Sequence, residues 1–254
     1  MSSKPSVPPP GDLALVAGTA DGAVAPARPV VVLLHGLART RFSLLGLAGH
    51  LERAGFTTWS RTYPSRTLSI AASADQIADA MARELPADRP LAAVTHSLGG
   101  ILIRHVAQRV PFTRVVMLAP PNQGSRLSRA LRDRPIYRWF FGHAGQELAA
   151  IAEAGPWPAL PPSTAVIAGT AAKASWNPTG WVSRRARIFA PGEPNDGTLA
   201  VVETQLDGMA AFATVDASHS WIMNHAAARA LVVRYLETGA MDRGTLDPIT
   251  GRRA

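Results

Sequence analysis

The fold class of this chain is decided by one segment, Leu91-Ala92-Ala93-Val94-Thr95-His96-Ser97-Leu98-Gly99-Gly100. Residues 91–94 form a short apolar run, as expected of a strand buried on both faces of a parallel sheet. Ser97 follows this strand, and the apolar residues after Gly99 continue as a predicted helix. A serine at such a strand–turn–helix junction, with small residues two positions before and after it, is typical of a tight turn that exposes a nucleophilic hydroxyl.

The residue two positions before Ser97 departs from the plain pattern. Thr95 stands where glycine is usual, and threonine is small but β-branched. A simpler interpretation is that Ser97 only caps the N-terminus of a helix, which is a common role for serine. The strand before Ser97, the helix after it and the partner residues described below favour the nucleophile.

Strands and helices alternate along the chain on both sides of this segment. This alternation predicts an α/β fold, a doubly wound and mostly parallel sheet with right-handed crossovers. Functional groups in such sheets gather at the carboxyl ends of the strands. The predicted strands cover 30–34, 56–59, 91–94, 114–118, 165–168, 187–189 and 212–215. The predicted helices cover about 40–54 (capped by Thr40 or Ser43), about 69–85 (beginning at Ser69 or Ser73), 98–110 and about 222–236.

The domain organisation follows from composition. Residues 1–25 are predicted to be a flexible N-terminal tail, 26–238 the α/β domain, and 239–254 a loose, polar C-terminal tail. Within the domain, residues 125–162 break the alternation and are expected to form a short helical insertion that caps the sheet. The first residues lack a basic region followed by an apolar one, and no apolar run approaches about 20 residues. A cytoplasmic protein without a transmembrane segment is therefore expected.

Composition limits the possible partners. The chain has no cysteine, which excludes disulfides and thiolate metal sites. Its net charge of +8 comes from scattered basic residues, mostly arginine, without a recognisable nucleic-acid-binding module. Solvated surface arginines are the simplest interpretation, with association to an anionic membrane surface as a weaker one. The histidines lack the spacing of a metal site, and no phosphate loop or dinucleotide fingerprint is present. We expect no metal, no cofactor and no nucleic-acid partner.

A nucleophilic serine requires a base, and in this kind of fold the base follows late in the chain. His219 and His225 both follow the last predicted strand. His219 lies in the loop directly after that strand, at the carboxyl edge of the sheet. His225 is predicted to lie inside the following helix, where a structural role is the better interpretation. We therefore predict His219 as the base.

The base in turn requires a carboxylate that orients it. Asp196 lies in the loop Asn195-Asp196-Gly197-Thr198, whose turn-forming residues can present the side chain inward. Asp216, three residues before His219, is the second candidate. Glu193 follows, and Asp207 also lies between Ser97 and His219.

An oxyanion hole would need two backbone N–H groups near the nucleophile. Leu98, at the start of the predicted helix, supplies one. The loop after the first strand supplies the other, with Leu37 as the preferred donor and Ala38 as the alternative, because Gly36 allows a sharp turn there. His35 and His96 flank the site and are interpreted as supporting residues.

Five segments share their order and spacing with a known family. They are LHGL (34–37), THSLGG (95–100), PPNQGS (120–125), NDGT (195–198) and ASH (217–219). Over about residues 30–236 the chain resembles the bacterial lipase and esterase branch of the α/β-hydrolases. The resemblance implies Ser97, Asp196 and His219 as a catalytic triad, with Leu37 and Leu98 as oxyanion donors. No secretion signal is visible and the insertion is short, so we do not expect an exported, fat-degrading lipase with a large lid.

The function expected from these residues is hydrolysis of a small-molecule carboxylic ester with an apolar acyl group. An acyltransferase or a thioesterase would use the same acyl-enzyme, and an inert binding module is a further alternative. Four aromatic residues of the insertion are expected either to line an acyl pocket or to form the core of the cap. They are Tyr137, Trp139, Phe140 and Phe141.

Overall fold

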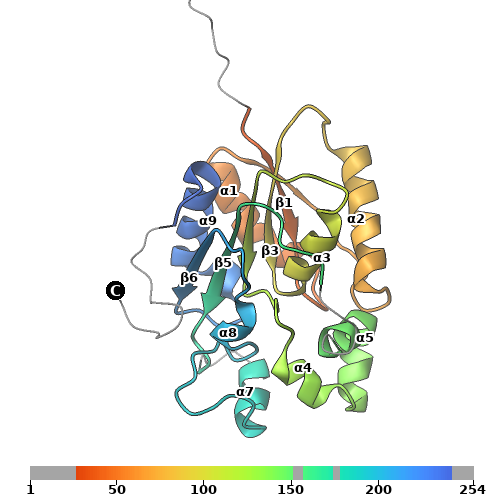
Figure 1. The fold of residues 1–254 in the computed structure, drawn as a ribbon, viewed down its shortest axis with the longest axis vertical. Helices are drawn as coiled ribbons and strands as arrows, with labels where there is room; N and C mark the ends of the chain where they lie inside the picture. Colours follow the sequence, from red (N-terminus) through yellow and green to blue (C-terminus); the bar gives the residue numbers. More distant parts are fainter. Residues whose placement is uncertain (1–26, 151–156, 174–177, 242–254) are drawn as a thin grey trace, which may run out of the picture.

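Six parallel strands form a single sheet in the order β2-β1-β3-β4-β5-β6 (Figure 1). The structure, a computed structural model, describes residues 27–150, 157–173 and 178–241. Predicted tail residues 1–25 and 242–254 lie outside the described residues. The strands are β1 (Val30–Leu34), β2 (Thr57–Ser60), β3 (Leu91–His96), β4 (Arg114–Leu118), β5 (Thr164–Gly169) and β6 (Ala211–Val215). The prediction of a doubly wound parallel sheet is confirmed.

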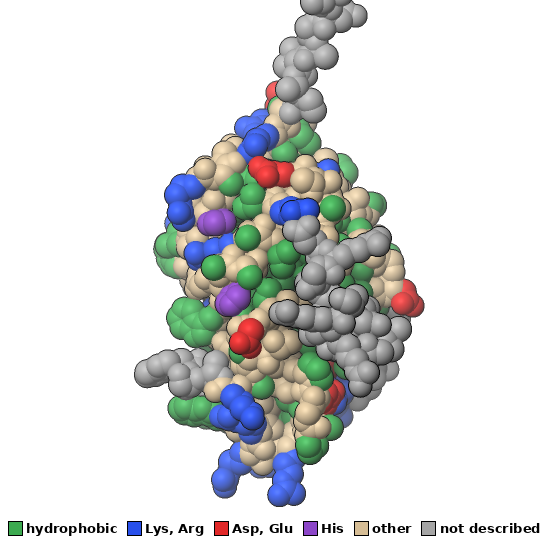
Figure 2. All heavy atoms as spheres, turned by 90° about the vertical axis from the view of Figure 1, so that its left-hand side faces the viewer, with side chains coloured by type: hydrophobic (Ala, Val, Ile, Leu, Met, Phe, Trp, Pro, Cys, Tyr) green, Lys and Arg blue, Asp and Glu red, His purple; other side chains and the backbone are tan. Residues whose placement is uncertain are grey.

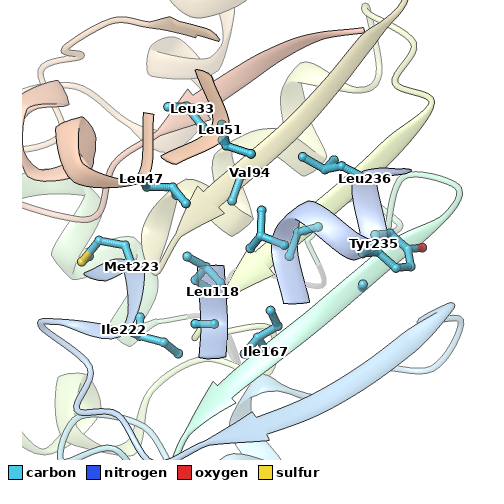
Figure 3. Close-up of a cluster of buried hydrophobic side chains, with 14 of the residues drawn as sticks. Leu33, Leu47, Leu51, Val94, Leu118, Ile167, Ile222, Met223, Tyr235 and Leu236 are labelled. Atoms are coloured by element: carbon cyan, nitrogen blue, oxygen red, sulfur yellow. The ribbon is translucent and has the colours of Figure 1, made fainter. Parts of the chain in front are cut away.

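Helices cover both faces of the sheet, as a doubly wound fold requires. On one face α1 (Leu45–Arg53) and α9 (Ala226–Thr238) pack against the strands. Figure 3 shows Leu47 and Leu51 of α1 and Leu236 of α9 converging on Val94 and Leu118 of the sheet. On the other face lie α2 (Ile70–Glu84) and α3 (Leu98–Val106). Burial of each large aliphatic side chain contributes roughly 1.5–3 kcal/mol, so these two layers stabilise the sheet.

Helix boundaries follow local capping chemistry. Ser69 rather than Ser73 begins α2, since its hydroxyl accepts a hydrogen bond from the Ala72 N–H. Thr40 precedes a 3-10 helix, η1 (Arg41–Leu44), which leads into α1 without a side-chain cap. The helix predicted over 222–236 consists of two parts, η2 (Ile222–Asn224) and then α9.

The strand predicted at Arg187–Phe189 is wrong. The segment follows α7 (Pro178–Arg185) as an irregular turn, with a positive φ of 50° at Arg187. β5 pairs directly with β6, so the sheet has no place for a strand between them. The Phe189 ring instead lies under the Arg126 guanidinium, 5.2 Å from its centroid. Two apolar residues, Ile188 and Phe189, are too few to distinguish a strand from a packed turn by sequence pattern.

In its described residues the predicted insertion contains two helices, α4 (Arg126–Leu131) and α5 (Pro135–Ala149), which we call the cap. With α7 they lie at the lower end of the molecule in Figure 1. Gly142 kinks α5 with a φ of 58°, and a Cβ there would overlap the Arg66 carbonyl oxygen. Glu147 of α5 accepts a hydrogen bond from the Ile70 N–H at the start of α2, a group with no partner inside its own helix. The cap is thus docked on the sheet domain.

Residues 151–156 of the predicted insertion lie outside the described residues. In the described part of the chain, no helix is both long and apolar enough to span a membrane.

Candidate active site

Ser97 occupies the sharp turn between β3 and α3. Its backbone has φ 51° and ψ −122°, a sparsely populated conformation for a residue with a side chain. Its N–H donates to the carbonyl oxygen of Leu118 on the neighbouring strand, at 2.9 Å. Gly99 is required because a Cβ at this position would lie 2.5 Å from the carbonyl oxygen of Leu34. The buried Thr95 side chain fits in the position where glycine is usual.

His219 lies in the loop after β6 and contacts Ser97. Its Nε2 is 2.9 Å from Ser97 Oγ, and its Nδ1 is 2.7 Å from Oδ2 of Asp196. The His219 N–H also donates to the Asp196 carbonyl oxygen, so backbone and side chain join the two loops. A serine hydroxyl, an imidazole and a carboxylate therefore form one continuous chain of contacts.

The Asp196 carboxylate is buried and fixed by its own loop. Its Oδ1 accepts hydrogen bonds from the N–H groups of Thr198, at 2.9 Å, and Leu199, at 2.7 Å. Oδ2 remains directed at His219. A carboxylate held by two N–H groups can orient an imidazole without rotating away.

The alternative acids and base lie elsewhere. The Glu193 carboxylate pairs with both terminal nitrogens of Arg126, and this guanidinium holds the pKa of Glu193 below its usual value. Asp216 is exposed and lines a separate hollow on the surface, and Asp207 is exposed. His225 stands at the N-terminal boundary of α9 rather than inside it. Among the described residues, Asp196 is the carboxylate that contacts His219.

The loop after β1 carries the candidate oxyanion donors. The Ala38 N–H donates to Ser65 Oγ at 3.2 Å, so this group already has a partner. The N–H of Arg39 donates to the Gly36 carbonyl oxygen and closes the turn. Leu37 therefore stays the better candidate beside Leu98 at the start of α3.

A cavity of about 810 Å³ reaches Ser97 and His219. Its lining is mostly apolar, and the cap contributes Leu127, Leu131, Ile136 and Leu148 to it. Tyr137, Phe140 and Phe141 line the cavity as expected of pocket residues. The expectation for Trp139 is wrong, because Trp139 does not belong to the lining of the cavity; it is 73% exposed, and its ring faces the guanidinium of Arg66.

The position of Trp139 has a simple physical reason. On a helix, neighbours in sequence point in different directions, so an aromatic run cannot face one cavity with every ring. Sequence reasoning also missed Arg39 and Arg134, which both line the cavity. The signal for Arg39 was its position directly after the predicted oxyanion loop.

Residues 31–252 match the model of the alpha/beta hydrolase family. The chain belongs to this family. A mature lipase of Bacillus licheniformis is similar over 85% of this α/β-hydrolase and 94% of its own chain, with 16% identity and a TM-score of 0.64. A metagenomic carboxyl esterase is similar over 78% and 67%, with 19% identity and a TM-score of 0.60. Phospholipase PlaB of Legionella pneumophila is similar over 83% and 60%, with 16% identity and a TM-score of 0.57.

At these identities the likeness to solved structures concerns the fold. A comparison with curated proteins finds no match. Within the described residues of this α/β-hydrolase, no three His, Cys, Asp or Glu side chains are grouped so that they could hold a metal ion.

Two buried histidines support the site of this α/β-hydrolase. The ring of His35 stacks on Tyr63 with centroids 4.1 Å apart, and its Nε2 accepts from the Tyr63 N–H. Burial lowers the pKa of His35 to about 4. Burial also lowers the pKa of His96 well below its usual value, and the neighbouring His219 contributes to this shift. Both rings are therefore neutral near pH 7 and serve as hydrogen-bonding supports.

Proposed function

We propose that this chain is a serine hydrolase that cleaves carboxylic esters through an acyl-enzyme. The observation that carries the proposal is the contact chain from Ser97 through His219 to Asp196 at a largely apolar cavity. Three proteins of similar structure are a lipase, a carboxyl esterase and a phospholipase. This likeness supports an ester as the substrate class here.

In the first half-reaction Ser97 Oγ attacks the ester carbonyl carbon and forms the new Oγ–C bond. His219 Nε2 takes the hydroxyl proton, and Asp196 stabilises the imidazolium through its Nδ1–H. The N–H groups of Leu37 and Leu98 stabilise the negative charge that develops on the carbonyl oxygen. The bond between the carbonyl carbon and the alcohol oxygen then breaks, and the alcohol leaves with the proton from His219.

In the second half-reaction water attacks the acyl-enzyme carbonyl. His219 takes a proton from this water, and the tetrahedral intermediate forms again. Its collapse breaks the Oγ–C bond and returns the proton from His219 to Ser97 Oγ. The products are a carboxylic acid and the free enzyme, and the reaction consumes only the ester and water.

The cavity lining supports an apolar acyl group as the bound part of the substrate. Tyr137, Phe140 and Phe141 lie beside leucines of the cap, and an acyl chain in contact with them would lose its exposure to water. A small-molecule ester with an apolar acyl group is therefore the substrate class that we propose.

The nucleophile is tested with p-nitrophenyl esters of increasing acyl length. Replacement of Ser97 by alanine is expected to lower kcat by about 1,000-fold or more, because one member of a triad leaves only the residual catalysis of the other groups. A fluorophosphonate probe is expected to label the wild-type chain at Ser97 and to leave the variant unlabelled. Wild-type activity in the Ser97→Ala variant would refute the assignment.

The acid is tested by three matched variants. Asp196→Asn is expected to lower kcat by about 1,000-fold or more with little change in KM, because the amide cannot hold the same imidazole tautomer. Asp216→Asn and Glu193→Gln are expected to keep most of the activity. Product analysis in added alcohol separates hydrolysis from acyl transfer, since a transferase forms the new ester in preference to the free acid.

A further inference from the structure

Arg39 is a cation placed in the cavity that the proposed function assigns to the substrate. It follows the proposed oxyanion donor Leu37 by two residues, and its backbone N–H closes the turn onto Gly36. The lining of the cavity includes Arg39 together with Ser97 and His219. The loop that would hold the reacting carbonyl oxygen therefore also contributes an arginine to the lining of the same cavity.

The Arg39 guanidinium has no hydrogen bond and no ion pair with any described residue. Two other arginines with little exposure, Arg104 and Arg126, have several partners each. Arg104 donates to the carbonyl oxygens of Trp157 and Pro158 and to Asn122 Oδ1, and Arg126 pairs with Glu193 and Glu203. Burial lowers the pKa of Arg39, because the charged guanidinium loses part of its contact with water. No hydrogen bond or ion pair with a described residue compensates for this loss.

The electrostatic setting of the cavity is positive. Arg134, directly before α5, lines the cavity with Arg39, and no described Asp or Glu side chain belongs to the lining. Basic side chains also gather on the surface at the lower end of the molecule, the end that carries the cap and α7 (Figure 2). Arg184, Arg185 and Arg187, in and after α7, are exposed. A positive field of this kind attracts anionic ligands and raises their rate of association.

We propose that Arg39 binds an anionic group of the substrate, and that the preferred esters combine an apolar chain with a carboxylate or a phosphate. A guanidinium presents several N–H donors in one plane, which matches two oxygens of either anion. The apolar cap residues would take the chain while Arg39 takes the anion. This proposal rests on the proposed function in one respect only, namely that the bond cleaved in the substrate is an ester bond.

A purely structural role of Arg39 makes a different prediction. Its charge is among the causes that lower the pKa of His35 and His96, so its removal alters the site whatever the substrate. Such an effect would change the turnover of neutral and anionic esters to the same degree. Substrate binding by Arg39 instead changes the ratio between them.

The kinetic experiment therefore measures that ratio. Hydrolysis of p-nitrophenyl hexanoate is compared with that of mono-p-nitrophenyl adipate, which has the same acyl length and a terminal carboxylate. Mono-p-nitrophenyl suberate and p-nitrophenyl octanoate extend the comparison. The ratio of kcat/KM, anionic over neutral, is expected to fall about tenfold or more in Arg39→Gln and less in Arg39→Lys. Arg83→Gln, an exposed arginine on α2, removes the same charge and is expected to keep the wild-type ratio.

A binding experiment tests the anion site without catalysis. Calorimetry on the Ser97→Ala variant compares hexyl phosphate, hexanoate and hexanol, which share one chain length. Both anions are expected to bind more tightly than hexanol, and the stronger of the two identifies the preferred anion. Adding Arg39→Gln is expected to remove this preference.

Two results would overturn the anion site. One is an equal affinity of the Ser97→Ala variant for hexanol and for both anions. The other is an anionic-to-neutral ratio, in binding or in kcat/KM, that stays at its wild-type value in Arg39→Gln, as it does in Arg83→Gln. Failure of the proposed function is separate: it would appear as the absence of ester turnover and of probe labelling at Ser97, while the calorimetry still reports on Arg39.

Discussion

The backbone carbonyl oxygen of His219 lies 2.9 Å from Nε2 of His96. A carbonyl oxygen only accepts hydrogen bonds, so Nε2 of His96 carries the proton and donates it. The residue beside the proposed nucleophile therefore holds the backbone of the proposed base. This bond connects the end of β3 with the loop after β6, two strands that are not neighbours in the sheet.

His96 is expected to act as a positioning residue. His96→Phe keeps an aromatic ring but removes the donor to His219, so the imidazole of His219 loses part of its orientation. We expect kcat to fall about tenfold or more while KM changes little, because small misplacements of a catalytic group are costly. His96→Gln keeps an N–H donor and is expected to recover part of the loss. Steady-state kinetics on a series of esters measures both, and wild-type kcat in a folded His96→Phe variant would contradict this role.

The aromatic residues of the cap divide into lining and surface positions. Phe141 lines the cavity, whereas Trp139 points away from it. Phe141→Ala is expected to lower kcat/KM for long-chain esters about tenfold relative to acetate, because the chain loses apolar contact. Trp139→Ala serves as the matched control and is expected to leave the chain-length preference intact. Equal effects of the two substitutions would mean that the cavity is not the acyl site.

Gly99 and Gly49 both lie in helices, but only at Gly99 does close packing require glycine. A Cβ at Gly99 would lie 2.5 Å from a backbone oxygen of β1, which cannot move without distorting the sheet. Gly99→Ala is expected to lower the free energy of unfolding by about 2 kcal/mol or more and to reduce activity. A Cβ at Gly49 of α1 would meet nothing within 4 Å, so Gly49→Ala is expected to raise that free energy by about 0.5–1 kcal/mol. Urea unfolding measures both, and a stable, fully active Gly99→Ala variant would refute the close contact.

Burial of His35 makes stability depend on pH. Its pKa is about 4 in the folded chain against an ordinary value of 6.5. Between these values the unfolded chain binds a proton that the folded chain does not, so stability falls as the pH decreases from about 6.5 towards 4. The share of His35 is about 2 kcal/mol between pH 7 and pH 5.

His35→Gln removes this titration and keeps polar groups at the site. The variant is expected to lose about 2 kcal/mol less free energy of unfolding than the wild type between pH 7 and pH 5. Other titrating groups, including His96, remain in both proteins and cancel in the comparison. Parallel pH profiles for the two proteins would show that His35 is not the group responsible.

Local pattern predicted most elements of the fold but not all of them. Short valine-rich runs, a serine between strand and helix, and Ser69 before an apolar helical stripe are signals contained in a few neighbouring residues. The segment Arg187–Phe189 carries the same kind of short apolar signal, yet it packs as a turn because β5 and β6 pair directly. Its structure depends on a partner strand far away in sequence.

The sequence by itself determined the parallel α/β architecture, the sharp turn at Ser97 and the order of serine, acid and histidine, because these depend on residue spacing along one stretch of chain. Only the tertiary structure decided which carboxylate meets the imidazole, since Glu193 pairs with Arg126 while Asp196 turns to His219. It also decided that Trp139 lies outside the cavity lining, and that Arg39 belongs to this lining and has no acidic partner among the described residues. These outcomes depend on contacts such as Ser97 to His219, between residues far apart in the chain, which local pattern does not encode.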